Sequence, residues 1–336
     1  TFGWIEALEQ VWWREGEILR PFCQRSGVKP RGSSRRVQRA LTDFGADEAF
    51  AQAAAKFHEH YGVEVSIHRV RTTTLGHAAR LVAQIPAPSR ALPAKGVEVL
   101  LAEADGCMVP TVVIGEAPPG GDRRKYRRTE WKELRLVAAR GSQAVQTHYA
   151  ATMLGVESAG DLWENTARAA GRGLNTRVHG VGDGAPWIAA QCLRRFGPQV
   201  GYLLDLFHVC DYLAAVWPGD RQTVQTHRDH LKAGAVDQVL SALRQREEPA
   251  DTPDELAPAR RALRYLENRP GQLDYPAAIH AGLPVGSGLI ESGNRHVLQR
   301  RRKLHGNWWL PANAHLMAHL RTPRANDAFH AYWSRN

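Results

Sequence analysis

Apolar residues recur at helical spacing in the first quarter of the chain. Within residues 46–83, Ala53, Ala54, Phe57 and Tyr61 repeat in this way, and Gly62 follows them as a helix stop. Ser66 is suited to cap a second helix over IHRVRTTTLGHAARL. The spacing predicts a helix-turn-helix, although helix pairs joined by glycine also occur in many proteins that never bind DNA.

After the Pro-rich linker 84–95, short apolar runs alternate with turn residues. VEVLLAEADG, TVVIGEA and WKELRLVAA predict three strands of a meander, the third after the basic loop DRRKYRR. A helix over 158–172, the strand RVHGVG, the helix PWIAAQCLRRFG and the strand VGYLLDLFH follow. Residues 209–269 read as mainly helical, and a last helix runs through LIESGNRHVLQRRRKL. This order predicts an α/β fold with a mixed sheet flanked by helices.

The composition is that of a soluble globular protein with roughly two domains for its 336 residues. No apolar run is long enough for a membrane span, and the first residues carry acids where a signal peptide needs a basic start. The cysteines Cys23, Cys107, Cys192 and Cys210 form no C-x-x-C pair, which argues against a zinc finger and suits a reducing cytoplasm.

The net charge of +10 favours polyanionic partners, with nucleic acid first, over a merely basic surface. Between Arg20 and Arg39 the chain holds seven Lys or Arg residues and no acid. This stretch is either a loop that lies on phosphates or a solvated linker.

Four acids stand where carboxylates are poorly placed as core residues. Asp105 ends an apolar strand, Asp183 follows RVHGVG, and Asp205 follows GYLL. Glu291 lies on the last helix, where Arg295 and Arg302 follow it four and eleven residues later and predict a basic stripe on its face. Each acid alone has an ordinary explanation as a turn or cap residue.

The predicted strand order brings these acids together, so as a group they indicate a site more strongly than any one of them does. The first and fourth strands are neighbours at the sheet centre, so their ends converge, and a later helix can bring a third acid across them. Three carboxylates without a Cys or His cluster suit Mg²⁺ or Mn²⁺. Two such ions roughly 4 Å apart can activate water or a 3′-hydroxyl for phosphodiester displacement.

Five motifs occur in order along the chain: EADGCMVP, WKEL, GDGAPWI, LLDLFHVCDYL and GSGLIESGNRHVLQRRRKLHGNWW. Together they resemble bacterial insertion-sequence transposases of the DDE class, of the Kra-type family, which is related to the mutator-like group. The N-terminal LTDFGADEAFAQAAAKFHEHYGVEVSIHRVR also resembles that family's leader, so the resemblance spans nearly the whole chain.

The resemblance implies a ribonuclease-H-like core: a mixed five-stranded sheet flanked by helices, with a helical N-terminal DNA-binding region and a helical insertion. Asp105, Asp183 and Glu291 match the catalytic triad and would hold two Mg²⁺ or Mn²⁺ ions. Asp205 and His208 match the D-x-x-H motif of the mutator-like relatives. Asp205 rivals Asp183 as the second metal ligand, and Asp183 is preferred because it ends the fourth strand. Otherwise Asp205 and His208 are a structural pair that pins strand to helix.

We therefore divide the chain into four parts. A helix-turn-helix-like DNA-binding region covers 1–90, and the first part of the catalytic core covers 96–211. A mainly helical insertion covers 212–280, and the last part of the core, with the Glu291 helix, covers 281–336.

Basic residues cluster near the predicted recognition helix, in the loop before WKEL, and after Glu291. Against the alternative of solvated faces, we expect the following residues to contact DNA: Arg69, Arg71, Arg123, Arg124, Lys125, Arg127, Arg128, Arg295, Arg300, Arg301, Arg302 and Lys303. Trp187, Trp308 and Trp309 are candidates for base stacking, although tryptophan is more often a core residue.

The sequence thus leads to the hypothesis of a transposase that binds the terminal inverted repeats of its own element. It would nick the DNA and join the freed 3′-hydroxyl to target DNA, working as a homo-oligomer in the bacterial cytoplasm, at the nucleoid, without a membrane partner. The alternatives are a domesticated or inactive DNA-binding relative and a structure-specific nuclease of the same fold. The sequence leaves open the end sequences, the oligomeric state and the route of second-strand cleavage, by hairpin or otherwise.

Overall fold

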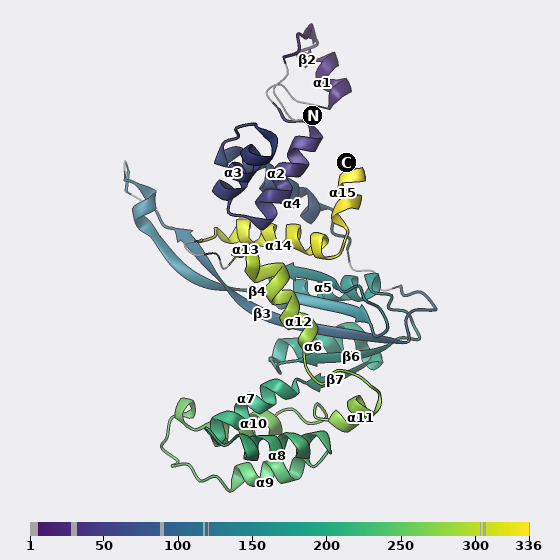
Figure 1. Cartoon of the computed structure of the whole chain (residues 1–336), viewed down its shortest axis with the longest axis vertical. Helices are drawn as coiled ribbons and strands as arrows, with labels where there is room; N and C mark the ends of the chain where they lie inside the picture. Colours follow the sequence, from purple (N-terminus) through teal and green to yellow (C-terminus); the bar gives the residue numbers. More distant parts are fainter. Residues whose placement is uncertain are drawn as a thin grey trace. The chain divides into compact units, whose positions relative to one another are not determined.

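The computed structural model in Figure 1 describes residues 6–27, 32–87, 91–116, 118–119, 121–302, 304 and 307–335. The chain forms two compact units. The first comprises residues 1–85, 110–131 and 297–336, and the second comprises residues 86–109 and 132–296. The four-part division made from the sequence stays a prediction.

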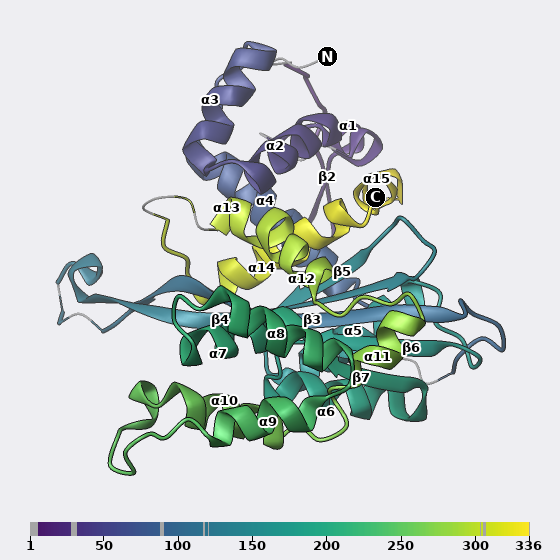
Figure 2. The ribbon, with the colours of Figure 1, turned by 60° about the horizontal axis from the view of Figure 1, so that its bottom comes forward.

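A five-stranded sheet runs through the second unit in the order β5-β4-β3-β6-β7 (Figure 2). Its strands are β3 (Val99–Ile114), β4 (Arg127–Gly141), β5 (His148–Thr152), β6 (Arg177–Gly182) and β7 (Val200–Leu204). β6 pairs in parallel with both β3 and β7, whereas β4 and β5 pair antiparallel. The predicted mixed sheet flanked by helices is therefore confirmed, as is the central position of β3 beside β6.

Three features of the strands differ from the prediction. The strand expected over VGYLLDLFH ends at Leu204, because Asp205 caps a helix that begins at Leu206. Residues 99–114, expected to belong to two strands of a meander, form the single strand β3, although Gly106 and Pro110 interrupt its apolar pattern. Proline has no N–H to donate, and the pairing of Pro110 with Trp309 does not require one. The Pro110 carbonyl accepts from the Trp309 N–H instead, so the strand tolerates this proline. The remaining sheet strand is β5, which the apolar pattern did not reveal.

The basic stretch DRRKYRR was expected to be a loop between the second and third strands, and this is only partly correct. It joins β3 to β4, with a short 3₁₀ turn, η1 (Arg123–Tyr126), followed directly by the first residues of β4.

Helices α5 (Val156–Ala169) and α6 (Pro186–Phe196) cover one face of this sheet. Alternate residues of β3, Leu100, Ala102 and Ala104, point to them, since successive strand residues face opposite sides. Trp163 of α5 is fully buried there and donates from Nε1 to the Ala138 carbonyl at 3.1 Å. The residues between them on β3, including Glu103 and Asp105, therefore face the other side.

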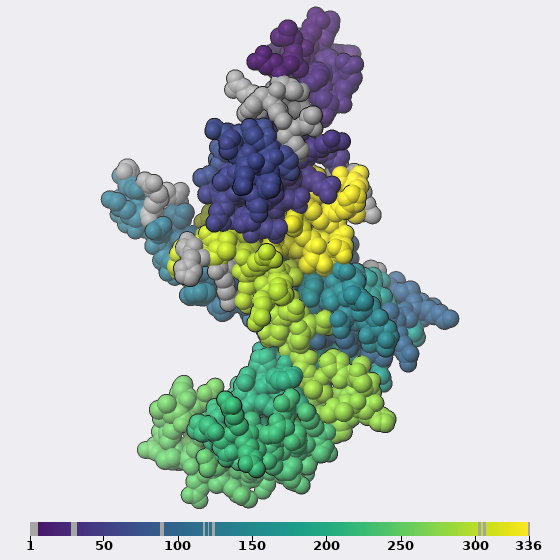
Figure 3. Space-filling view, viewed as in Figure 1, coloured from purple at the N-terminus to yellow at the C-terminus, as the bar shows by residue number. Residues whose placement is uncertain are grey.

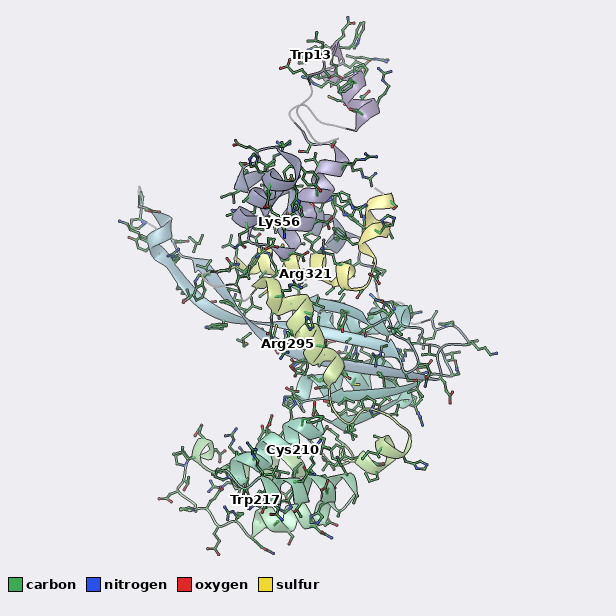
Figure 4. The ribbon with its side chains drawn as sticks, in the orientation of Figure 1. Trp13, Lys56, Cys210, Trp217, Arg295 and Arg321 are labelled. Atoms are coloured by element: carbon green, nitrogen blue, oxygen red, sulfur yellow. The ribbon has the colours of Figure 1, made fainter. Side chains whose placement is uncertain are left out.

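A helical segment follows β7 and packs as one body on the ends of β6 and β7 (teal and green in Figure 3). It consists of α7 (Leu206–Val216), α8 (Arg221–Lys232), α9 (Val236–Arg244), a 3₁₀ turn, η3 (Asp254–Leu256), α10 (Pro258–Glu267) and α11 (Tyr275–His280). Cys210 and Trp217 lie among these helices (Figure 4). Residues 212–280 are mainly helical, as expected, and their assignment as an insertion stays a prediction.

The last predicted helix is interrupted. α12 (Gly288–Gly293) widens into a π-helical segment, η4 (Asn294–Gln299), before α13 (Arg300–Arg302). Because a π turn holds more residues than an α turn, the eleven-residue spacing used to predict a basic stripe beyond Glu291 does not apply.

The first unit is built on α2 (Arg35–Asp47), α3 (Phe50–Tyr61) and α4 (Ile67–Ala83). Gly62 ends α3 in the left-handed conformation, and the Ser66 hydroxyl caps α4 by accepting from the Arg69 N–H at 3.1 Å, as predicted. Phe57 is fully buried between the helices. The helix-turn-helix spacing is therefore present, and DNA binding through it stays a prediction.

Short elements precede this bundle. They are β1 (Trp12–Arg14), β2 (Glu17–Leu19) and α1 (Pro21–Ser26). The basic stretch expected to be a loop or linker thus contains α1 and the start of α2, whereas its residues 28–31 lie outside the described residues.

Helices α14 (Pro311–Ala325) and α15 (Phe329–Arg335) complete the first unit. Arg321 of α14 (Figure 4) donates to the Ala46 carbonyl and to Asp47, which ties α14 to α2. Arg301 is 1% exposed, with its guanidinium over the rings of Phe50 and Trp309. The expectation that Arg301 contacts DNA is therefore wrong in this structure, because its charge is enclosed by aromatic side chains.

No helix in the described ranges combines the length and the apolar character needed to cross a lipid bilayer.

Buried His77 of α4 predicts an acid sensitivity of the first unit. Its ring nitrogens contact the Tyr332 hydroxyl at 2.7 Å and the Gln38 amide oxygen at 2.9 Å. Burial, together with the charges of Arg80 and Arg35, lowers its pKa from 6.5 to about 4. As the pH falls below about 6.5, the unfolded chain binds a proton at His77, whereas the folded chain binds it only near pH 4. Acidification through this range therefore lowers the free energy of unfolding, and above pH 6.5 this group has no effect on it.

We expect the loss to approach about 3 kcal/mol at the acid end of that window. Melting temperatures measured from pH 4 to pH 7 should fall less steeply on acidification for His77→Gln than for the unmodified chain. Identical slopes for the two proteins would contradict this assignment.

Candidate functional site

The strand register brings three of the predicted acids to one edge of the sheet. Glu103 of β3 pairs with Val181 of β6, and two residues further on the same register sets Asp105 beside Asp183. Gly182 pairs with Leu204 of β7, and one residue further on the register sets Asp183 beside Asp205. Neighbouring strands lie about 4.8 Å apart, so these residues leave the sheet side by side.

Asp105 is half-buried and experiences the charge of the other predicted triad members. Burial raises its pKa to about 6, and the negative charges of Asp183 and Glu291 add to this rise, while His208 opposes it. The Asp105 carboxylate also accepts from the N–H of Gly106 at 2.7 Å and from the side-chain amide of Asn294. The three acids therefore share one electrostatic environment.

The loop that carries Asp183 is held by the helical segment. Its main-chain carbonyl accepts from the Tyr265 hydroxyl at 2.6 Å, and the next carbonyl, of Gly184, accepts from Arg269 Nη2 at 2.6 Å. Gly184 has a φ of +82°, and an added Cβ would lie 2.6 Å from a Leu204 methyl carbon, so only glycine fits after Asp183. The carboxylate accepts from the Ala185 N–H at 2.8 Å.

Asp205 has its oxygens fully engaged by protein donors. Oδ1 accepts from the N–H of Phe207 at 2.6 Å, and Oδ2 accepts from the N–H of Ser287 at 2.7 Å and from the Ser287 hydroxyl. His208 Nδ1 lies 3.4 Å from Oδ2. Burial opposes ionisation of Asp205, but the His208 contact and these hydrogen bonds together lower its pKa to about 2.

The contact with Asp205, aided by the charges of Asp183 and Glu291, raises the pKa of His208 to about 9 despite partial burial. The contact between Asp205 and His208 is compatible with the structural interpretation of the D-x-x-H motif. The preference for Asp183 over Asp205 as a metal ligand stays a prediction.

Glu103 is a buried acid that sequence reasoning missed. It is 1% exposed, and burial raises its pKa to about 8. Its Oε2 accepts from the N–H of Ile290 at 2.9 Å, in the first turn of α12. The available signal was an acid in the middle of the apolar run VLLAEA, which must find a buried donor.

The glycines of GSGLIESG are explained by close packing. A Cβ on Gly286 would lie 2.5 Å from a ring carbon of Phe207. A Cβ on Gly293 would lie 2.5 Å from the Tyr149 ring and 3.0 Å from Leu136. These separations are shorter than van der Waals contact, so the segment packs this closely on α7 at Gly286 and on the sheet at Gly293 because both positions lack a side chain.

With the segment fixed in this way, Glu291 of α12 and Asn294, the first residue of η4, lie near Asp105 of β3. Glu291 is exposed to solvent, and its charge acts on Asp105. Asn294 is 3% exposed and donates from Nδ2 to Asp105 Oδ2. The three-residue spacing puts both on one side of the helix. Asn294 was not predicted as a site residue.

The chemistry of the donor set fits a hard divalent cation. Asp105, Asp183 and Glu291 offer only oxygen ligands, and a bound cation would offset the negative charges of Asp183 and Glu291 that act on Asp105. The buried amide oxygen of Asn294, Oδ1, has no hydrogen-bond partner within the described part of the chain. Among the described residues, no three His, Cys, Asp or Glu side chains are already gathered at ligand distance.

A further acid, Glu133 of β4, lies next to the site and is paired. Its Oε2 accepts from Arg135 Nη2 on the same strand. An added Cβ on Gly106 would meet Glu133 Oε1 at 2.2 Å, so the glycine after Asp105 leaves room for this carboxylate. This pairing with Arg135 distinguishes Glu133 from Asp105, Asp183 and Glu291.

The predicted DNA-contacting residues fall into four groups, one of which is the buried Arg301 described above. Exposed residues are Arg71, Lys125, Arg127, Arg128, Arg295 and Arg300. Arg69 is partly buried and donates to the Ser33 hydroxyl at 2.6 Å. The side chains of Arg123, Arg124 and Arg302, and all of Lys303, lie outside the described residues. Arg128 pairs with Glu130 at 2.8 Å, and Arg295 lies on the helical segment after α12 (Figure 4).

The three candidate stacking residues differ in exposure. Trp308 is 48% exposed, whereas Trp309 is 6% exposed and hydrogen-bonds through its backbone to β3. Trp187 is half-buried, with the Arg135 guanidinium 5.5 Å from its ring centre. Trp309 is therefore a core residue, and Trp308 is the most accessible of the three.

Comparison with known proteins places the chain in one family. The profile of the uncharacterised protein family UPF0236 matches residues 29–327, which is most of the chain, so the chain belongs to that family. No curated protein matches it.

The buried hydrogen bonds of Asp205 predict a large effect on stability. Asp205→Ala leaves the N–H groups of Phe207 and Ser287 without acceptors, so we expect the free energy of unfolding to fall by about 3 kcal/mol. Asp220→Ala is the matched control, because Asp220 caps α8 from an exposed position. Urea denaturation measures both, and equal losses would contradict the role given to Asp205.

Proposed function

We propose that this member of the UPF0236 family is a DNA transposase of the DDE class with a ribonuclease-H-like core. The observation that carries the proposal is the meeting of Asp105 and Asp183 at adjacent ends of parallel strands, within the electrostatic reach of Glu291. Asp105 and Asp183 lie 78 residues apart in the sequence, and Asp183 and Glu291 lie 108 residues apart.

In this proposal Asp105, Asp183 and Glu291 hold two Mg²⁺ or Mn²⁺ ions. Bound ions would supply activation of water or of a 3′-hydroxyl and stabilise the leaving oxygen. The protein supplies the alignment. The β3–β6 register sets two carboxylates side by side, Tyr265 and Arg269 fix the loop of Asp183, and the docked α12 adds Glu291.

The basic surface supplies the affinity for DNA. The exposed cations of α4, of the start of β4 and of the segment after Glu291 suit phosphate contacts, which carry most of the nonspecific binding energy. We assign element-end recognition to the helix-turn-helix of the first unit, where Arg71 and His68 are exposed near the start of α4.

Two alternatives remain distinct from this proposal. An inactive DNA-binding relative would retain the basic surface but would not cut. A structure-specific nuclease would cut but would not join DNA strands. The helix-turn-helix and the helical segment between β7 and α12 favour the transposase over a minimal nuclease.

The decisive experiment uses duplex DNA copied from both flanks of the coding region in its genome, where inverted repeats are expected. The purified full-length chain should nick this DNA with Mn²⁺ or Mg²⁺, join the 3′ ends to a plasmid, and lose both activities when EDTA is added. Cutting without joining would favour the nuclease, and binding without cutting would favour the inactive relative.

Asp105→Asn should abolish cleavage, because it removes the charged ligand at the centre of the three acids, while binding to the same DNA survives. Gel-shift and cleavage assays on one preparation separate these effects. Asp237→Asn, at an exposed position in the first turn of α9, is the matched control and should cut normally. If Asp105→Asn still cuts, Asp105 is not a required ligand.

Arg295→Ala should weaken binding to DNA of any sequence and reduce the slope of log K against log salt by about 1, as expected for the loss of one phosphate contact. Arg177→Ala is the control, because Arg177 is exposed at the opposite end of β6 from Asp183. Fluorescence anisotropy over a salt series measures both. An unchanged slope for Arg295→Ala would remove Arg295 from the interface.

A further inference from the structure

Asn294 combines two features that rarely occur together. Its side chain is 3% exposed, and its amide nitrogen is already committed to Asp105. Its amide oxygen, Oδ1, is buried and has no hydrogen-bond partner among the described residues. A buried carbonyl oxygen without a partner destabilises the folded chain, so such an atom needs an explanation.

The orientation of this amide is fixed by charge. With Nδ2 toward Asp105, an N–H meets a carboxylate oxygen, whereas the flipped amide would set two acceptors against each other. Oδ1 is therefore the amide atom without a hydrogen-bond partner among the described residues, close to the negative charges of Asp105, Asp183 and Glu291. Another acceptor is useful there only to a donor or to a cation.

Amide oxygens are established ligands of hard divalent cations, alongside carboxylates. Asparagine also adds an oxygen ligand without adding a fourth negative charge to three that already repel. Its position three residues after Glu291, at the first residue of η4, places it on the same side of the helix as that acid.

We propose that Asn294 is an additional metal ligand of this site, coordinating through Oδ1 while Nδ2 holds the Asp105 carboxylate in position. This inference rests on the metal-dependent function proposed above, and it adds a neutral ligand to the three acids. It also assigns a role to the ESGN sequence beyond its glutamate: Gly293 permits the close approach to Tyr149, and Asn294 then reaches Asp105.

The test is Mn²⁺ binding to the full-length chain, measured by isothermal titration calorimetry without DNA. Asn294→Ala should bind Mn²⁺ at least about tenfold more weakly than the unmodified chain. Asn294→Asp should bind at least as tightly as the unmodified chain, because a carboxylate oxygen replaces the amide oxygen. Ser292→Ala, an exposed neighbour on α12, is the control and should bind normally.

Unchanged affinity in Asn294→Ala would overturn the inference. Equal weakening in Asn294→Ala and Asn294→Asp would also overturn it, because Asn294 would then act only as a donor to Asp105. If Asn294→Ala does not fold, as judged by circular dichroism, Asn294→Asp decides: Mn²⁺ must raise its melting temperature as much as that of the unmodified chain. Absence of Mn²⁺ binding to the unmodified chain would overturn the proposed function as well.

Discussion

The structure around the site depends on how one segment, Gly286–Asn294, is fastened to the sheet by two buried carboxylates. Asp205 accepts from the backbone and hydroxyl of Ser287, and Glu103 accepts from the backbone of Ile290. Both acids are almost fully shielded from water, where an unpaired charge or acceptor is expensive, so the segment has few alternatives to this position. The location of Glu291 follows from bonds made by its neighbours rather than by Glu291 itself.

The acids near the ends of these strands differ in the charges that act on them. Asp205 lies beside His208, Glu133 pairs with Arg135, and Glu103 accepts from the N–H of Ile290 at the start of a helix. Asp105 also accepts from protein donors, but the negative charges of Asp183 and Glu291 act on it as well. This accumulation of negative charge, rather than a lack of hydrogen bonds, distinguishes Asp105, Asp183 and Glu291 from the other three acids.

Much of this arrangement was accessible from local patterns. The alternation of strands and helices predicted the neighbouring positions of β3 and β6, and Asp105 and Asp183 follow from those strand ends. The sequence did not reveal β5, because HYAAT is short and has no clear alternation of apolar and polar residues, and it becomes a strand by pairing with β4. It also missed Glu103 and Asn294, whose partners lie 187 and 189 residues away. The predicted basic stripe after Glu291 assumed uniform α-helical spacing, which the π-helical turn after Gly293 interrupts.

The hydrogen bonds from Tyr265 and Arg269 to the carbonyls of residues 183 and 184 give the helical segment a structural task inside the core. Both donors bind backbone carbonyls, so these two hydrogen bonds do not depend on the side chain at position 183. A shortened protein in which β7 was joined directly to α12 would lose these two donors together. Any shortened version of the chain would need new hydrogen-bond donors for these two carbonyls. The helical segment is for this reason an integral part of the fold.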